Sequence, residues 1–201
     1  SEDGSRAISG TSRIPSGYVP SLVKFPVSKL SDTESRLEEV YARMARTANV
    51  RMPATRLIEV GNGRVAFAAD RFDRKGAARI HMHSASGLLE VDHRAPTLDY
   101  DSLLRLTRML TRNQVEVEAM YRLAVFNVLG HNRDDHAKNF AFLRDAEGTW
   151  SLAPGFDLTF SSGPGGEHMT SVLGRGKDVP VDVLKDLGAS ASIPLSTCDR
   201  I

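Results

Sequence analysis

The sequence contains the stretch Phe126-Asn-Val-Leu-Gly-His-Asn-Arg-Asp-Asp-His-Ala-Lys-Asn-Phe140, followed by Trp150-Ser-Leu-Ala-Pro-Gly-Phe-Asp157. Within it, Arg133-Asp134 is followed after four residues by Asn139, and Asp157 comes after the next pair of apolar runs. A carboxylate, an amide and a second carboxylate at this spacing match the demands of phosphoryl transfer. One carboxylate accepts the proton of an attacking hydroxyl, and the other two groups hold the Mg²⁺ ions of the triphosphate. We therefore predict Asp134 as the catalytic base and Asn139 and Asp157 as the metal ligands.

The flanking residues predict where this loop sits. Apolar residues recur at helical spacing before it, and Gly130 supplies a helix stop. These residues are Val117, Met120, Tyr121, Ala124, Val125 and Leu129. After the loop, residues 140–143 and 150–152 are predicted to form a hairpin across the turn 144–148. The hairpin would return Phe156 and Asp157 toward Asn139.

The loop resembles that of the HipA family of bacterial serine/threonine kinases, which are toxins of toxin–antitoxin modules. The family pattern is approximately D-x-H-A-K-N-F, with an aromatic-Asp pair farther along the chain. The matching residues are Asp134, His136, Ala137, Lys138, Asn139, Phe140, Phe156 and Asp157. The resemblance implies binding of ATP and Mg²⁺, with His136, Ala137 and Lys138 on the nucleotide side. For His136 the residues themselves favour a structural role that shapes the turn, and the alternative for Lys138 is a position in solvent.

Two segments nearer the amino terminus extend the resemblance. Lys24, in Ser21-Leu-Val-Lys-Phe-Pro26, corresponds to the family's phosphate-binding lysine. Asp70, Arg71 and Phe72 correspond to the hinge against the adenine. The helix between these segments should carry the glutamate that pairs with the lysine, for which we choose Glu38 over its neighbour Glu39.

The chain departs from the family pattern at the loop that covers the phosphates. HipA-like kinases carry a G-x-x-x-K loop, which residues 1–20 do not show in recognisable form. In this family a serine of that loop can be autophosphorylated, which silences the kinase. Ser9 is our candidate, followed by Ser5 and Ser12.

We predict an α+β, two-lobed, protein-kinase-like fold. Residues 1–96 would form a mixed α/β small lobe with the lysine and the hinge, and residues 97–201 a mainly helical catalytic lobe. With 201 residues the chain is short for two kinase lobes, so we expect some loops of the family to be missing from this numbering. The expected elements are strands at 22–25, 57–60 and 65–69, a helix behind a capping box at 31–34, an irregular stretch at 74–96, a helical face around Leu103, Leu104, Thr107 and Leu110, and a helix at 180–187 capped by Gly188.

Charge and composition limit the partners and the cellular compartment that we expect for the protein. The net charge of +1 argues against a broad nucleic-acid surface, because non-specific DNA binding needs many phosphate contacts. The chain has one cysteine, so it forms no internal disulfide, and it shows no apolar run of membrane-spanning length. We therefore expect a cytoplasmic protein with no membrane partner, and the resemblance implies a bacterial one.

The resulting functional hypothesis is an ATP-dependent serine/threonine protein kinase. The resemblance implies an aminoacyl-tRNA synthetase as the protein substrate, a helix-turn-helix antitoxin as the partner, and DNA contact only through that antitoxin. The alternatives are a small-molecule kinase and a catalytically inactive kinase fold that acts by binding. A more distant alternative is a metal-dependent phosphohydrolase that uses His131, Asp134, Asp135 and His136 as ligands.

Overall fold

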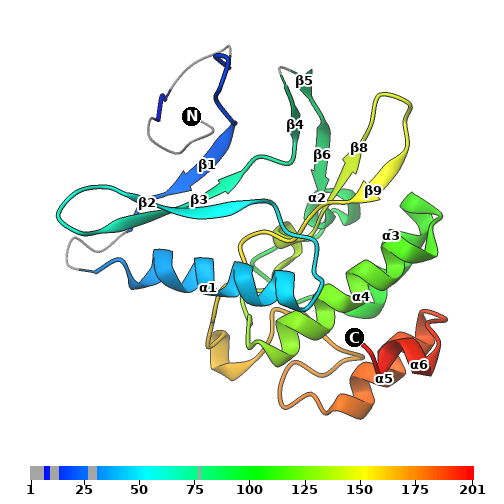
Figure 1. Ribbon diagram of the computed structural model, residues 1–201. Helices are drawn as coiled ribbons and strands as arrows, with labels where there is room; N and C mark the ends of the chain where they lie inside the picture. Colours follow the sequence, from blue (N-terminus) through cyan, green and yellow to red (C-terminus); the bar gives the residue numbers. More distant parts are fainter. Residues whose placement is uncertain (1–6, 10–13, 27–30, 77) are drawn as a thin grey trace.

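The structure of the protein is a computed structural model that describes residues 7–9, 14–26, 31–76 and 78–201. It is a mixed α/β arrangement with two three-stranded antiparallel sheets, which lie in the upper half of the view, and most of its helices below them (Figure 1). Two further short strand pairs and two 3-10 turns complete it.

The first sheet has the strand order β1-β3-β2 and comes from the amino-terminal part of the chain. Its strands are β1 (Ser21–Lys24), β2 (Thr55–Glu59) and β3 (Val65–Asp70), with Lys24 opposite Phe67. Helix α1 (Thr33–Thr47) lies along one side of this sheet (Figure 1). The three strands agree with the prediction to within about two residues, the usual uncertainty of strand ends.

The start of α1 differs from the predicted capping box. The helix begins at Thr33 after Asp32, and Ser31 Oγ accepts a hydrogen bond from the N–H of Thr33 at 3.2 Å. The Asp32 carboxylate bonds instead to the Arg36 guanidinium at 3.0 Å and to the N–H of Val65 at 2.9 Å. Asp32 therefore ties the helix start to β3 rather than capping its first turn.

The second sheet has the order β6-β8-β9. The predicted hairpin is confirmed as β8 (Ala141–Arg144) and β9 (Trp150–Leu152). The prediction of an irregular stretch at 74–96 is wrong, because this stretch contains β4 (Arg74–Lys75), β5 (Ala78–Arg79), β6 (His81–Ser84) and α2 (Ala85–Leu89). Strand β6 pairs with β8, far along the chain, and such a distant partner leaves no trace in the local pattern.

Two long helices form the centre of the molecule. Helices α3 (Tyr100–Thr111) and α4 (Gln114–Leu129) lie side by side, and α4 ends at Gly130 as predicted (Figure 1). The short strands β7 (Leu98–Asp99) and β10 (Thr170–Ser171) pair in parallel beside them. The largest fully buried apolar side chains belong to Tyr100, Leu103, Leu104, Val117, Met120, Tyr121, Phe140, Phe142, Val172 and Leu187.

The carboxyl-terminal part adds helices α5 (Val181–Ser190) and α6 (Leu195–Cys198). Gly188 does not cap α5 as predicted but lies inside it, because the helix continues to Ser190. A Cβ atom at this position would lie 2.4 Å from Cys198 Sγ and 3.1 Å from Tyr121 Cζ. Glycine is therefore needed here for close packing and not for a helix stop.

A buried polar network holds the loop after α4 in place. Asp135 is fully buried; its Oδ2 accepts from the Tyr100 hydroxyl at 2.7 Å and lies 2.9 Å from His168 Nδ1. Its Oδ1 accepts from the main-chain N–H groups of Met169 and Thr170 at 2.8 and 3.2 Å. Asp135 thus joins the start of α3, the loop and β10 in one buried site.

The network continues toward α4 through amide side chains. Asn127 Nδ2 donates to the Tyr100 hydroxyl at 3.0 Å, and Asn132 Nδ2 donates to Asn127 Oδ1 at 3.0 Å. Burial and the nearby charge of Asp135 raise the pKa of Tyr100 well above its ordinary value. The Tyr100 hydroxyl consequently keeps its proton and serves as a permanent donor to Asp135.

Replacing Tyr100 with phenylalanine should lower the free energy of unfolding by about 1–3 kcal/mol, because Asp135 loses a donor and Asn127 loses its acceptor while both stay buried. Urea unfolding measures this cost. Tyr18→Phe is the matched control, since the Tyr18 hydroxyl makes no hydrogen bond to the described residues, and it should cost less than about 0.5 kcal/mol. Equal costs for the two variants would contradict a stabilising role of the network.

Candidate functional site

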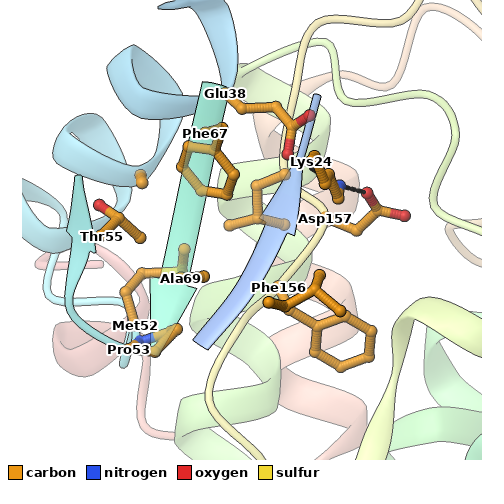
Figure 2. A pocket seen from close by; sticks show the side chains of 12 residues that line it. Lys24, Glu38, Met52, Pro53, Thr55, Phe67, Ala69, Phe156 and Asp157 are labelled. Atoms are coloured by element: carbon orange, nitrogen blue, oxygen red, sulfur yellow. Dashed lines mark hydrogen bonds and ion pairs between the residues drawn. The ribbon is translucent and has the colours of Figure 1, made fainter. Parts of the chain in front are cut away.

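Lys24 lies at the centre of a three-residue ionic cluster. Its ammonium is 2.8 Å from Glu38 Oε2 and also contacts Asp157 Oδ1 (Figure 2). The lysine comes from β1, the glutamate from α1, and the aspartate from the segment after β9. This is the pairing that the sequence predicts for Lys24 and Glu38. Glu39, the neighbouring candidate, is buried and pairs with Arg43 at 2.7 Å instead.

The cluster has an unequal charge balance that shapes its pKa values. Burial lowers the pKa of Lys24, but hydrogen bonds to Asp157 and Glu38 outweigh it, so that the pKa lies above its ordinary value. Burial raises the pKa of Glu38 more than its pairing with Lys24 lowers it. The two upward shifts are consistent with each other, because two carboxylates stabilise one ammonium while each carboxylate shares that ammonium with the other. The cluster keeps one excess negative charge when all three groups are ionised.

The path of the chain after β9 explains how Asp157 reaches Lys24. The Gly155 N–H donates to the Arg51 carbonyl at 2.7 Å, and a Cβ at Gly155 would lie 3.0 Å from Met52 Sδ. Because Gly155 has no side chain, the segment after β9 can pass close to Arg51 and Met52, which follow α1. Asp157 itself has a φ of 58°, a left-handed conformation that aspartate tolerates better than most residues.

An apolar cavity of about 180 Å³ adjoins the cluster. Figure 2 shows Met52, Pro53, Thr55, Phe67 and Ala69 in its lining, together with the three charged side chains. The ring of Phe156 also lines the cavity and packs 5.7 Å from the ring of Phe72. An apolar chamber with a lysine and two carboxylates at its edge has the chemistry to hold a flat heterocycle and the phosphates and cation attached to it.

The predicted hinge residues are mostly engaged within the protein. Asp70 pairs with Arg56 at 2.6 Å, and Arg71 pairs with Asp73 at 2.6 Å. The N–H groups of Asp70 and Arg71 donate to the Ala54 and Pro20 carbonyls. None of the residues Asp70, Arg71 and Phe72 lines the cavity, and only Phe72 approaches it, through Phe156.

The loop after α4 presents Asp134 and orients Asn139. Asp134 is exposed, and its main-chain carbonyl accepts a hydrogen bond from Asn139 Nδ2 at 2.9 Å. Asn139 is buried at the end of the 3-10 turn η1 (Ala137–Asn139). With its nitrogen fixed in this way, Asn139 has its amide oxygen left as the ligand that a cation would use. No hydrogen bond between described residues joins Asp134 or Asn139 to Asp157.

The remaining loop residues lie in two environments. Ala137 is buried, whereas Lys138 is exposed and its Nζ lies 3.2 Å from Nε2 of His93. His136 is half-buried, and its Nδ1 is buried without a hydrogen-bond partner among the described residues. The ring of His136 meets the ring of His93 edge-on at 5.6 Å.

Sequence reasoning considered Asp135 as a metal ligand alone, and it did not find His93. Asp135 has no role in the phosphoryl-transfer pattern, yet its carboxylate holds the loop through the buried network. The available signal was the presence of Asn127 and Tyr100 next to apolar residues of the predicted core, since buried polar groups require partners. His93 carried no signal at all, because it lies far from the loop in sequence.

The geometry also bears on the phosphohydrolase alternative. Asp135 turns into the buried network and is unavailable as a ligand beside Asp134 and His136. In the part of the chain that the structure describes, no group of three or more His, Cys, Asp or Glu side chains is arranged to hold a metal ion. The same residues include no helix long and apolar enough to cross a membrane.

One of the three predicted autophosphorylation sites lies in the part of the chain that the structure describes. Ser9 is exposed in the described segment 7–9. Ser5 and Ser12 lie outside the described residues.

Comparison with known proteins identifies the fold. The HipA chain of the Shewanella oneidensis MR-1 toxin–antitoxin complex with HipB and operator DNA superposes with a TM-score of 0.71 and 16% identity, over 95% of this chain and 55% of that chain. The Helicobacter pylori proinflammatory kinase CtkA superposes with a TM-score of 0.52 and 19% identity, over 68% of this chain and 50% of that chain. The chain thus spans about half the length of these two structures, and the likeness shows a kinase-like fold.

The family assignment rests on the sequence match. The model of the HipA-like C-terminal domain matches residues 8–199, which is nearly the whole chain. The chain therefore belongs to the HipA-like C-terminal domain family.

Proposed function

We propose that the protein is an ATP-dependent serine/threonine protein kinase that requires Mg²⁺. The observation that carries this proposal is the Lys24 ammonium held between the carboxylates of Glu38 and Asp157, at the edge of an apolar cavity. Three separate elements contribute these side chains, so their convergence is a property of the fold and not of local sequence. A lysine in this position can bind phosphates when the nucleotide displaces one of its carboxylate partners.

The chain's residues then divide the work of phosphoryl transfer. Asp134, exposed at the loop, would accept the proton of the attacking Ser or Thr hydroxyl. Asn139 and Asp157 would hold Mg²⁺, and Lys24 would hold the phosphates while Glu38 fixes its position. The bound cation would supply charge neutralisation of the triphosphate. Asp135 would keep the loop in register through its buried network.

In this proposal the chain has the two lobes of a protein kinase, divided near residue 96. The sheet β1-β3-β2 with α1 belongs to the smaller lobe, and α3 to α6 belong to the larger. Asp157 contacts Lys24 across this division. Closure of the lobes on a nucleotide would then bring Asp134 and Asn139 toward the phosphates.

We further propose that the kinase is a toxin of a toxin–antitoxin module in the bacterial cytoplasm. The solved complex of a HipA chain with HipB and operator DNA supports an antitoxin partner that brings the DNA contact. The family resemblance supports an aminoacyl-tRNA synthetase as the substrate, whose phosphorylation would halt translation. Incubation with γ-labelled ATP and a bacterial lysate, followed by identification of the labelled protein, tests the substrate class.

The two aspartates should fail differently when each is replaced by asparagine. Asp134→Asn should retain Mg²⁺-ATP affinity within about threefold but lower transfer by at least about a hundredfold, because the base is lost. Asp157→Asn should weaken Mg²⁺-dependent nucleotide binding as well. Calorimetric titration and a γ-labelled ATP assay measure the two effects. Transfer by both variants within about tenfold of the parent, equivalent to about 1.4 kcal/mol in the barrier, would refute the assigned roles.

Glu38 and Glu39 offer a matched pair on the same helix. Glu38→Gln should weaken ATP binding about tenfold, because Lys24 loses a charged partner that orients it. Glu39→Gln removes the partner of Arg43 and Arg46 instead. It should lower the unfolding midpoint while leaving the ATP affinity of the folded protein unchanged. A stronger loss of affinity from Glu39→Gln would transfer the role to Glu39.

Autophosphorylation of Ser9 should weaken ATP binding, because a phosphoserine adds roughly 1.5 to 2 negative charges near the triphosphate. Intact-mass measurement and peptide mapping after incubation with Mg²⁺-ATP locate the site, and Ser9→Ala should prevent both the modification and the loss of affinity. Asp134→Asn controls for phosphorylation by a contaminating kinase. Phosphate found solely beyond residue 20 would eliminate this mechanism and leave the kinase proposal intact.

A further inference from the structure

His93 contacts the catalytic loop from a segment that lies far from it in sequence. Its Nε2 is 3.2 Å from the ammonium of Lys138, the residue immediately before Asn139. The turn that carries His93 has a defined shape, since Asp92 Oδ1 accepts from the Arg94 N–H at 3.0 Å and the Ala95 N–H donates to the Asp92 carbonyl. The imidazole is therefore presented to the loop by an ordered turn.

The contact requires one protonation state of the imidazole. An ammonium group only donates hydrogen bonds, so Nε2 of His93 must offer its lone pair. The proton of the neutral ring then resides on Nδ1, which lies 3.6 Å from Asp92 Oδ1. The carboxylate favours this tautomer, because it attracts the Nδ1–H group. In a protonated ring both nitrogens carry a proton, so neither could accept from Lys138, and the two positive charges would repel each other.

Lys138 needs such a contact to keep a fixed position. It is exposed, and a free lysine side chain samples many rotamers. Its main chain is fixed in η1, where the Asn139 N–H donates to the His136 carbonyl at 2.8 Å. The imidazole of His93 thus restrains the one flexible part of a residue that is otherwise held between His136 and Asn139.

We infer that His93 is a positioning residue that, in its neutral form, fixes the Lys138 ammonium next to Asn139, the proposed Mg²⁺ ligand, where it adds positive charge for the phosphoryl transfer. This inference rests on the proposed phosphotransfer and adds to it a dependence on pH. Protonation of His93 would release Lys138 and slow the transfer. The imidazole acts through Lys138 and does not itself touch the substrate.

The charges around His93 support the neutral form. Partial burial lowers the pKa of His93, and the charges of Lys138, His136 and Arg94 lower it further, while Asp92 raises it. The net direction is below the ordinary value of 6.5, so the ring is mainly neutral at pH 7. The contact with Lys138 is consequently present near neutrality and is lost as the pH falls through the pKa of His93.

Ring titration by NMR tests the contact without reference to activity. Histidine ring signals of the parent and of Lys138→Gln are followed from about pH 5 to about pH 8, the range in which imidazole titrates. The pKa of His93 should rise in Lys138→Gln, because a positive neighbour is removed. An unchanged pKa overturns the inference, even if the protein transfers phosphate.

The pH profile of phosphotransfer tests the consequence. His93→Ala should lower the rate at neutral pH about tenfold, whereas His93→Gln, whose amide oxygen can accept from Lys138, should stay within about threefold. His93→Gln should also lose part of the parent's decline below pH 7, because the amide does not titrate. His81→Gln, at the exposed start of β6, is the matched control and should leave rate and profile unchanged.

The outcomes separate this inference from the proposed function. A pH profile of His93→Gln identical to that of the parent, or equal rates for His93→Ala and the parent, overturns the positioning role. Absence of transfer by the parent overturns the proposed function instead. In that case the ring titration alone decides whether His93 controls Lys138.

Discussion

The buried carboxylate of Asp135 is the constraint on which the arrangement of the loop after α4 depends. A fully buried charge is costly unless it is surrounded by donors, and Asp135 receives them from Tyr100, from His168 and from two main-chain N–H groups. These donors come from α3 and from the segment around β10, so the loop cannot shift without breaking several hydrogen bonds at once. Asp134, the residue before Asp135, is exposed, because the side chain of Asp135 is held in the interior.

A second constraint couples the two halves of the candidate site. Lys24 contacts one carboxylate from α1 and another from the chain after β9, which makes the position of Asp157 sensitive to the position of α1. One turn farther along the same face of α1, the Tyr41 hydroxyl donates to the Gly130 carbonyl at 2.5 Å and so joins the helix to the loop after α4. Displacement of α1 would therefore disturb both Lys24 and the start of that loop.

The residues predicted as the hinge also have a structural use. Asp70 and Arg71 form ion pairs and main-chain hydrogen bonds at the end of the first sheet, and they do not line the cavity. Partly exposed ion pairs contribute little stability, but here they fix the exit of β3. The apolar walls of the cavity come from residues such as Met52, Phe67 and Phe156.

The sequence by itself determined the local features of this protein. The strands of the first sheet, the hairpin after the loop and the end of α4 at Gly130 followed from apolar periodicity and turn residues, which act over a few positions. Only the tertiary structure decided the rest. The pairing of β6 with β8, the packing role of Gly188, the buried partners of Asp135 and the contact of His93 with Lys138 all join residues far apart in the chain. Such contacts depend on which surfaces meet when the elements pack, and a local pattern carries no record of its distant partner.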